Sequence, residues 1–162
     1  MPFAYYARLT RSQQAVYKRS DGITAVPLQG AGTFGPLVDE LAHALAGEDR
    51  LVCQAAAQRL MTALTERLGV PPLRVEVLAA RPHRTWGELH GLYTPARGRV
   101  PPKVTVWMRT ARQHRVVAFR TFLRTLLHEL GHHLDCRLFR LPDSFHTEGF
   151  YKRESSLFHQ LV

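Results

Sequence analysis

The segment HELGH at residues 128–132 carries the side chains best suited to chemistry in this chain. Its two histidines, at positions i and i+4, project from the same face of a helix about one turn apart. That spacing lets both imidazoles bind one tetrahedral Zn²⁺ ion at about 2.0–2.1 Å. Glu129 leaves the helix about 100° around from His128, where it reaches a metal-bound water more easily than the metal. The segment predicts a zinc site made by His128 and His132, with Glu129 as general base.

The third protein ligand of this site has two candidates, which both follow the helix-breaking Pro142. A catalytic zinc site takes three protein ligands and leaves the fourth position to water or substrate. His146 would complete a set of three histidines, whereas Glu154 would complete a His₂Glu set from the last predicted helix. Tyr151 and Arg153 are candidate donors to the oxyanion of a transition state, or groups that support the ligands.

The chemistry expected of these groups is hydrolysis of a peptide bond in a protein or peptide substrate. Zinc would polarise the carbonyl and activate water, and Glu129 would pass the proton to the leaving amine. We expect Gly131 to leave room where substrate or a strand approaches the helix. The alternative is a non-catalytic zinc-binding domain with a regulatory or sensor role. The presence of Glu129 argues against it, because structural zinc needs no base.

Two helices are expected to position these residues. An apolar stripe at helical spacing predicts a long helix over residues 115–139, and a last helix starts at Thr147 or Gly149 and ends at Leu161. Strands are predicted over residues 73–78, 88–94 and 104–108. The last of these strands is expected to line the cleft and to pair with an extended peptide.

The first part of the chain is predicted to be helical, with helices over residues 10–18, 34–45 and 49–68. Residues 1–70 would form this helical part, and residues 71–162 the strands, the metal-binding helix and the C-terminal helix. The expected fold is therefore one α+β, zincin-like domain over residues 1–162. In it a small, mostly antiparallel sheet packs against the metal-bearing helix, and the N-terminal helices cover the other side.

Several of these features resemble the SprT-like metalloproteases. A strand leads to a helix with HExxH, and His146 and Phe150 follow at the positions of a further histidine and phenylalanine of that family. The resemblance covers residues 73–160, including the lead-in 122–128. It implies a zinc peptidase with His128, His132 and His146 as ligands and Glu154 as a group that orients a ligand.

The chain departs from the SprT-like pattern in two respects. Thr147 stands where that family usually has a glycine, and the chain has only two cysteines, so it lacks the four of the zinc ribbon found in some members. The spacing of Glu154 is instead similar to that of the gluzincins, including the small IrrE-like ones. In those proteins a helical glutamate after HExxH is the third ligand. We favour His146.

Positive charge is concentrated before the metal segment. The net charge is +9, and no acidic residue lies between Glu88 and Glu129. A field of one sign attracts anionic partners. The basic side chains of the stretch 97–124 therefore suggest an alternative function, a DNA-associated protease or DNA-binding protein. SprT-like relatives include enzymes that act on DNA-bound proteins. These side chains are Arg97, Arg99, Lys103, Arg109, Arg112, Arg115, Arg120 and Arg124.

Composition limits the class of protein further. The chain has 162 residues with 45% hydrophobic and 22% charged side chains, as expected of one globular domain. No apolar run approaches the roughly 20 residues of a membrane span. The first residues lack the pattern of a secretory signal, so we expect a cytoplasmic protein. Cys53 and Cys136 are expected to be buried, reduced thiols.

Overall fold

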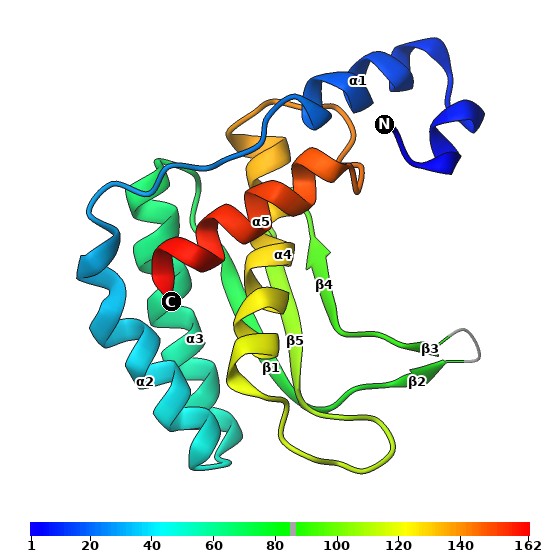
Figure 1. The fold of residues 1–162 in the computed structure, drawn as a ribbon. Coiled ribbons are helices and arrows are strands. Elements are labelled where there is room, and N and C mark those ends of the chain that lie inside the picture. The colour runs from blue at the N-terminus through cyan, green and yellow to red at the C-terminus, as the bar shows by residue number, and fades with distance from the viewer. Residues whose placement is uncertain (85–86) are drawn as a thin grey trace.

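The computed structural model describes residues 1–84 and 87–162, and Figure 1 shows its helices packed beside and across a small sheet. Its helices are α1 (Arg11–Asp21), α2 (Gly35–Ala46), α3 (Arg50–Leu68), α4 (Phe119–Arg137) and α5 (Glu148–Leu161), with short 3₁₀ helices η1 (Ala4–Arg8) and η2 (Ala31–Phe34). Its strands are β1 (Arg74–Ala80), β2 (His83–Arg84), β3 (Gly87–Glu88), β4 (Gly91–Thr94) and β5 (Lys103–Arg109). The predicted α+β class is confirmed.

The main sheet is mixed rather than mostly antiparallel. Its strand order is β1-β5-β4, with β1 parallel and β4 antiparallel to β5. The reason is the order in which the chain visits the strands. β1, β4 and β5 alternate in direction, and β5 inserts between the other two, so the first and last strands become parallel neighbours. β2 and β3 form a separate antiparallel hairpin.

The two edges of the sheet differ in whether another element caps them. Gln58 and Gln54 of α3 accept hydrogen bonds from the backbone N–H groups of Val75 and Val77, at 2.8 and 3.0 Å, so α3 caps the outer edge of β1. β4 forms the opposite edge. The prediction that strand 104–108 could pair with a peptide is wrong, because β5 already has a neighbour on each side. Only β4 offers a free edge for strand addition in the described sheet.

One face of the sheet packs on the helices. Register and burial place the apolar residues of this face against the core, with α4 lying across β4 and β5 (Figure 1). They are Val75, Val77, Val104, Val106 and Met108. On the opposite face Arg74, Leu92 and Thr94 are exposed, although Thr105 and Trp107 of the central strand β5 are buried there. The prediction that the N-terminal helices cover the other side is wrong, because α3 packs on β1, α2 on α3 and α4, and α1 on α5.

The metal-bearing helix starts later than its apolar stripe predicts. Val116 forms a β-bridge with Arg109, and the N–H of Val117 donates to the carbonyl of Met108 at 2.8 Å. These residues are therefore extended, and α4 begins at Phe119 after an extended Ala118. The apolar side chain of Val117 is buried in the core without being helical. Periodicity alone does not separate the two conformations.

The start of α5 is locked to α1. The hydroxyl of Thr147 accepts from the N–H of Phe150 and caps the helix. The N–H of Gly149 donates to the carboxylate of Asp21 at 3.0 Å. A Cβ at Gly149 would lie 2.6 Å from the carbonyl oxygens of both Ser20 and Asp21. Only glycine therefore allows the two helices to approach this closely.

We expect Gly149→Ala to destabilise the protein by about 1–3 kcal/mol, because the added methyl group would push α5 away from a rigid backbone. The measurement is equilibrium unfolding in urea. Gly32→Ala is the matched control, since a Cβ there would meet nothing within 4 Å, and its effect should stay within about 0.5 kcal/mol. Equal effects of the two substitutions would contradict the steric argument.

Two further sequence expectations have outcomes in the fold. Within the described residues, no helix is long and apolar enough to cross a membrane. Cys53 is buried as predicted, but Cys136 is exposed. Cys136 lies on a side of α4 that lines a pocket together with Leu92 and Pro95, so the prediction of a buried thiol is wrong there.

Candidate metal centre

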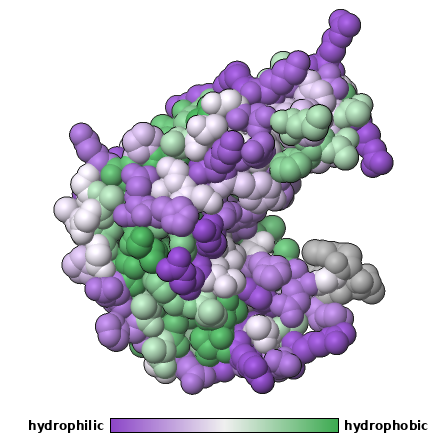
Figure 2. All heavy atoms as spheres, in the orientation of Figure 1, coloured by the Kyte–Doolittle hydropathy of each residue, from purple (hydrophilic) through white to green (hydrophobic). Residues whose placement is uncertain are grey.

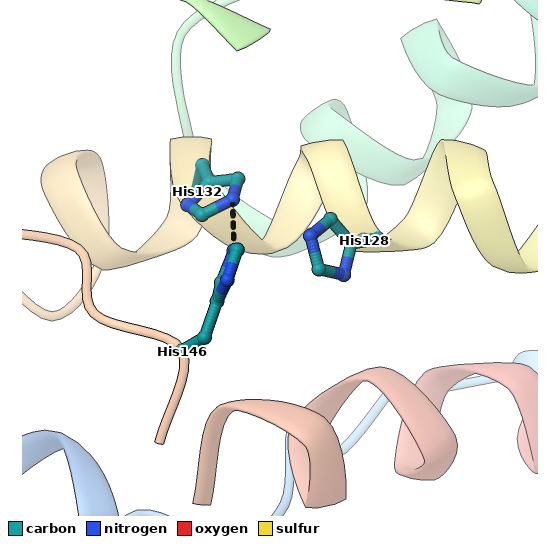
Figure 3. A group of neighbouring side chains, drawn as sticks. All are labelled: His128, His132 and His146. Carbon is teal, nitrogen blue, oxygen red and sulfur yellow. Dashed lines mark hydrogen bonds between the residues drawn. The ribbon is translucent and has the colours of Figure 1, made fainter. Parts of the chain in front are cut away.

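Three histidines converge where α4 meets the loop before α5. His128 and His132 project from one face of α4, and His146 reaches them from that loop (Figure 3). One ligand atom from each residue lies within 4.8 Å of those of the other two. The Nε2 atoms of His132 and His146 are 3.0 Å apart. Two ligands of a tetrahedral zinc site are separated by about 3.3 Å, so these three nitrogens suit such an ion.

Hydrogen bonds orient the two imidazoles of α4. The Nδ1 of His128 lies 2.8 Å from Oε1 of Glu154, and the Nδ1 of His132 lies 2.7 Å from the Ser144 hydroxyl. The Ser144 hydroxyl donates its proton to Asp135, so it must accept from His132. A carboxylate likewise only accepts. Both rings therefore carry a proton on Nδ1, which leaves Nε2 as the atom of each ring that could bind a metal.

Glu154 occupies the outer side of His128. One carboxylate oxygen faces the Nδ1 atom of that ring, and the other lies 3.4 Å from the guanidinium of Arg124. The group of three convergent ligand atoms contains His146 and does not contain Glu154. Of the two candidates for third ligand, the structure therefore brings the histidine to the site and places the glutamate behind a ligand.

Burial keeps the histidines in the form that binds metal. Burial lowers the pKa of His132 to about 3, and the charges of His146 and His128 add to this effect. Partial desolvation of the ring also lowers the pKa of His146, although the residue as a whole is exposed, and His128 contributes further. Neutral imidazoles are required for coordination, so the site does not have to lose protons from these two rings to bind a cation at neutral pH.

Glu129 is held against the edge strand of the sheet. Its side chain is only 6% exposed, and burial raises its pKa to about 7 against the opposing effect of His128. A Cβ at Gly91 would lie 2.8 Å from Thr125 Cγ2 and 3.0 Å from the Glu129 carboxylate. Gly91 thus lets β4 approach the carboxylate closely. A group whose pKa is near neutrality suits proton transfer.

Phe150 fills the space beneath the three histidines. Its ring centroid lies 5.0 Å from that of His128, 4.8 Å from His132 and 5.2 Å from His146. A Cβ at Gly131 would come within 3.0 Å of this ring. Phe150 of α5 therefore takes the room left by Gly131. The prediction that substrate or a strand approaches the helix there is wrong.

The two candidate oxyanion donors lie in different places. Tyr151 is 41% exposed, and its ring centroid lies 5.7 Å from that of His146. Arg153 is buried, and its guanidinium donates to Asp135 at 2.9 Å and to the carbonyl of Ser20. Arg153 therefore supports the site through Asp135 and does not face the cleft, whereas Tyr151 stands beside the histidines.

The sequence interpretation missed several residues of the site. Asp135 and Ser144 form the chain of hydrogen bonds behind His132. Asp135 follows His132 by three positions on α4, and this spacing is the one signal that could have indicated it.

His133 is fully buried, accepts from the Tyr93 hydroxyl and donates to the carbonyl of Pro71, both at 2.9 Å. It ties α4 to β4 and does not belong to the ligand set.

Two pockets lie on either side of Glu129 and beside β4. One has a volume of about 430 Å³ and is lined by Glu88, His90, Arg124 and Glu154, among others. The second, of about 330 Å³, is more apolar and is lined by Leu92, Tyr93, Leu141 and Pro142 together with His132. Figure 2 shows the molecule hollowed between the N-terminal segment and strands β3 and β4. The histidines therefore open onto a cleft that runs past the edge strand.

The basic stretch 97–124 does not form one uniform surface. Lys103 pairs with Glu76, Arg109 with Glu48, and Arg124 with Glu154. Four of the other five cations lie at opposite ends of β5, because Arg97 and Arg99 precede this strand and Arg112 and Arg115 follow it. The fifth, Arg120, lies on α4 over the ring of Phe158. Binding of nucleic acid through this stretch stays a prediction. The pairing of three of its cations and the dispersal of the others among the described residues do not favour it.

Comparison of the chain with family models, with curated proteins and with solved structures gives no match. The resemblance to SprT-like metalloproteases therefore rests on the residues themselves. The geometry of the histidines and of Glu129 is what bears on function.

We expect Ser144→Ala to weaken zinc binding about 10- to 100-fold, because His132 loses the partner that sets its tautomer and orientation. Competition with a chromophoric chelator measures this change. Ser12→Ala, on the exposed surface of α1, is the matched control and should leave the affinity unchanged. An affinity unaltered in Ser144→Ala would argue that the hydroxyl has no part in holding the ligand.

Proposed function

We propose that this protein is a zinc-dependent metallopeptidase of the HExxH type, which hydrolyses peptide bonds in protein or peptide substrates. The observation that carries the proposal is the group of three histidines whose ligand atoms lie within 4.8 Å of one another, next to a buried glutamate. His128, His132 and His146 would hold the ion. Three imidazoles that leave the fourth position to water or substrate are a donor set typical of catalytic zinc.

Glu129 would act as the general base. Bound zinc would supply a Lewis acid for the substrate carbonyl and lower the pKa of water. Glu129 would take the proton of the attacking water on its carboxylate and deliver it to the leaving amine. Its pKa, raised to about 7 by burial, suits both steps. Tyr151 would be the side chain that contacts a developing oxyanion. Its ring lies 5.7 Å from that of His146, whereas Arg153 donates to Asp135.

The free edge of strand β4 favours a polypeptide over other classes of substrate. An extended peptide could add to its free edge by main-chain hydrogen bonds. Glu129 contacts this strand at Gly91, so a peptide on β4 would run past the base and the histidines. The flanking pockets would take side chains on either side of the scissile bond.

The test is cleavage of a peptide library by the purified, zinc-loaded full chain, with the products identified by mass spectrometry. We expect cleavage that stops when a chelator removes zinc and returns when zinc is restored. The variant with His128→Ala and His132→Ala is the control and should be inactive. One equivalent of bound zinc without cleavage of any peptide would instead support a non-catalytic zinc-binding domain. Failure to bind zinc would overturn the proposal.

A further inference from the structure

The third histidine is held in a different way from the other two. His128 and His132 stand on α4, and each Nδ1 atom is hydrogen-bonded. His146 lies outside any helix, its residue is exposed, and its Nδ1 atom has no hydrogen bond to the described residues. Its ring packs on Phe150 at 5.2 Å, but no hydrogen bond orients Nδ1, so the backbone of the loop that carries it contributes more to the position of this ring than the backbone of α4 does for the other two.

The N-terminal segment holds that loop. The Tyr5 hydroxyl donates to the carbonyl of His146 at 2.8 Å, across a long separation in sequence. One residue further, the hydroxyls of Ser20 and Thr147 lie 3.1 Å apart in a buried contact. Figure 1 shows α1 beside the start of α5, directly after the loop that carries His146. The backbone at the carbonyl of the third ligand and directly after it is thus held by residues from the beginning of the chain.

Aromatic packing strengthens this attachment. The ring of Phe145, directly before His146, lies 6.4 Å from that of Tyr5 and 6.2 Å from that of Tyr17. Tyr5 and Tyr17 also meet edge to face at 5.6 Å. Pairs at these separations are stabilising. Phe145, directly before the ligand, is therefore packed against η1 and α1, whereas Ser144 one residue earlier is bonded to His132 and Asp135 of α4.

We infer that residues 3–21 form an N-terminal clamp that completes the metal centre, with Tyr5 as a positioning residue for His146. The inference rests on the proposed metal site and adds the element that determines its third ligand. With the clamp in place, three imidazoles face one point. With the clamp displaced, α4 still presents two, and the site becomes a weak two-histidine site.

The test compares Tyr5→Phe with Tyr6→Phe in the full chain. Each substitution removes one hydroxyl from the same aromatic cluster, since Tyr6 also packs on Tyr17, at 5.1 Å. The Tyr6 hydroxyl makes no hydrogen bond to the described residues. We expect Tyr5→Phe to weaken Co²⁺ and Zn²⁺ binding about 10-fold, as is typical of groups that orient a ligand, and Tyr6→Phe to leave binding unchanged.

A double-mutant cycle with His146→Ala separates positioning from a general effect on folding. If Tyr5 acts through the third ligand, Tyr5→Phe should have no further effect on Co²⁺ affinity once His146 is replaced. The absorption spectrum of bound Co²⁺ gives a second readout, because Tyr5→Phe should shift it towards that of His146→Ala. Unfolding of the metal-free protein should change little.

The outcomes distinguish this inference from the proposed function. If the unsubstituted protein binds Co²⁺ and Tyr5→Phe binds it equally well, the clamp is refuted and the metal centre stands. A loss of affinity that persists in the His146→Ala background also refutes the clamp, because Tyr5 would then act on the fold in general. If the unsubstituted protein binds neither Co²⁺ nor Zn²⁺, both the proposed function and the clamp fail.

Discussion

Glu129→Gln should abolish peptide hydrolysis while zinc stays bound. The amide keeps the size of the side chain and so still fits beside Gly91, but it cannot accept a proton from water. Because a positioned general base contributes about 10²–10⁴-fold to rate, we expect kcat to fall by at least that factor. Steady-state cleavage of a peptide found in the library, together with zinc stoichiometry, measures the two effects separately.

The matched control for this prediction is Glu148→Gln. Glu148 is an exposed residue that pairs with Lys152 on the surface of α5, so its substitution should leave both activity and zinc content unchanged. Full activity in Glu129→Gln would remove this carboxylate from the mechanism. Loss of zinc from the same variant would show that Glu129 acts on the ligand set and not on proton transfer.

Arg153→Met should destabilise the protein by about 3–5 kcal/mol, the usual effect of removing one partner of a buried ion pair. The Arg153 and Asp135 side chains are 3% and 0% exposed. Burial raises the pKa of Asp135, and the charge of Arg153 opposes that shift. Without Arg153, the Asp135 carboxylate and the carbonyl of Ser20 would lose a buried donor. Urea unfolding of the metal-free protein measures the change.

Lys152→Ala is the control for Arg153→Met. Lys152 forms an i,i+4 pair with Glu148 in which the two side chains are 54% and 50% exposed, and such pairs contribute only about 0.2–0.5 kcal/mol. The contrast between neighbouring positions on α5 isolates the effect of burial. Similar small losses in both variants would mean that the Arg153–Asp135 pair contributes no more than a surface pair.

The spacing of apolar residues predicted most of the elements, because the buried face of a helix or strand follows from the spacing of its own apolar residues. The helices α1, α2, α3 and α5 begin and end within a few residues of the predicted bounds. Errors arose where conformation depends on distant partners. Val116 joins the helical stripe in sequence, yet its bridge to Arg109 makes it extended. The parallel pairing of β1 and β5 likewise depends on which strands meet, and spacing along the chain carries no such information.

By itself, the sequence determined the part of the candidate site that lies within one helix. His128, Glu129 and His132 are adjacent on α4, so helix geometry alone predicts that the two histidines share a face and that the glutamate stands beside them. This is why the HELGH segment could be interpreted before any fold was known.

Only the tertiary structure decided how the rest of the site is built. In sequence both His146 and Glu154 were candidates for the third ligand, with His146 favoured. The packing of α5 and its preceding loop brings His146 to the ligand atoms and Glu154 to the Nδ1 of His128. The contact of Tyr5 with the carbonyl of His146 had no signal in the sequence. The physical reason is that these contacts join segments far apart along the chain, which only the packing of the whole domain brings together.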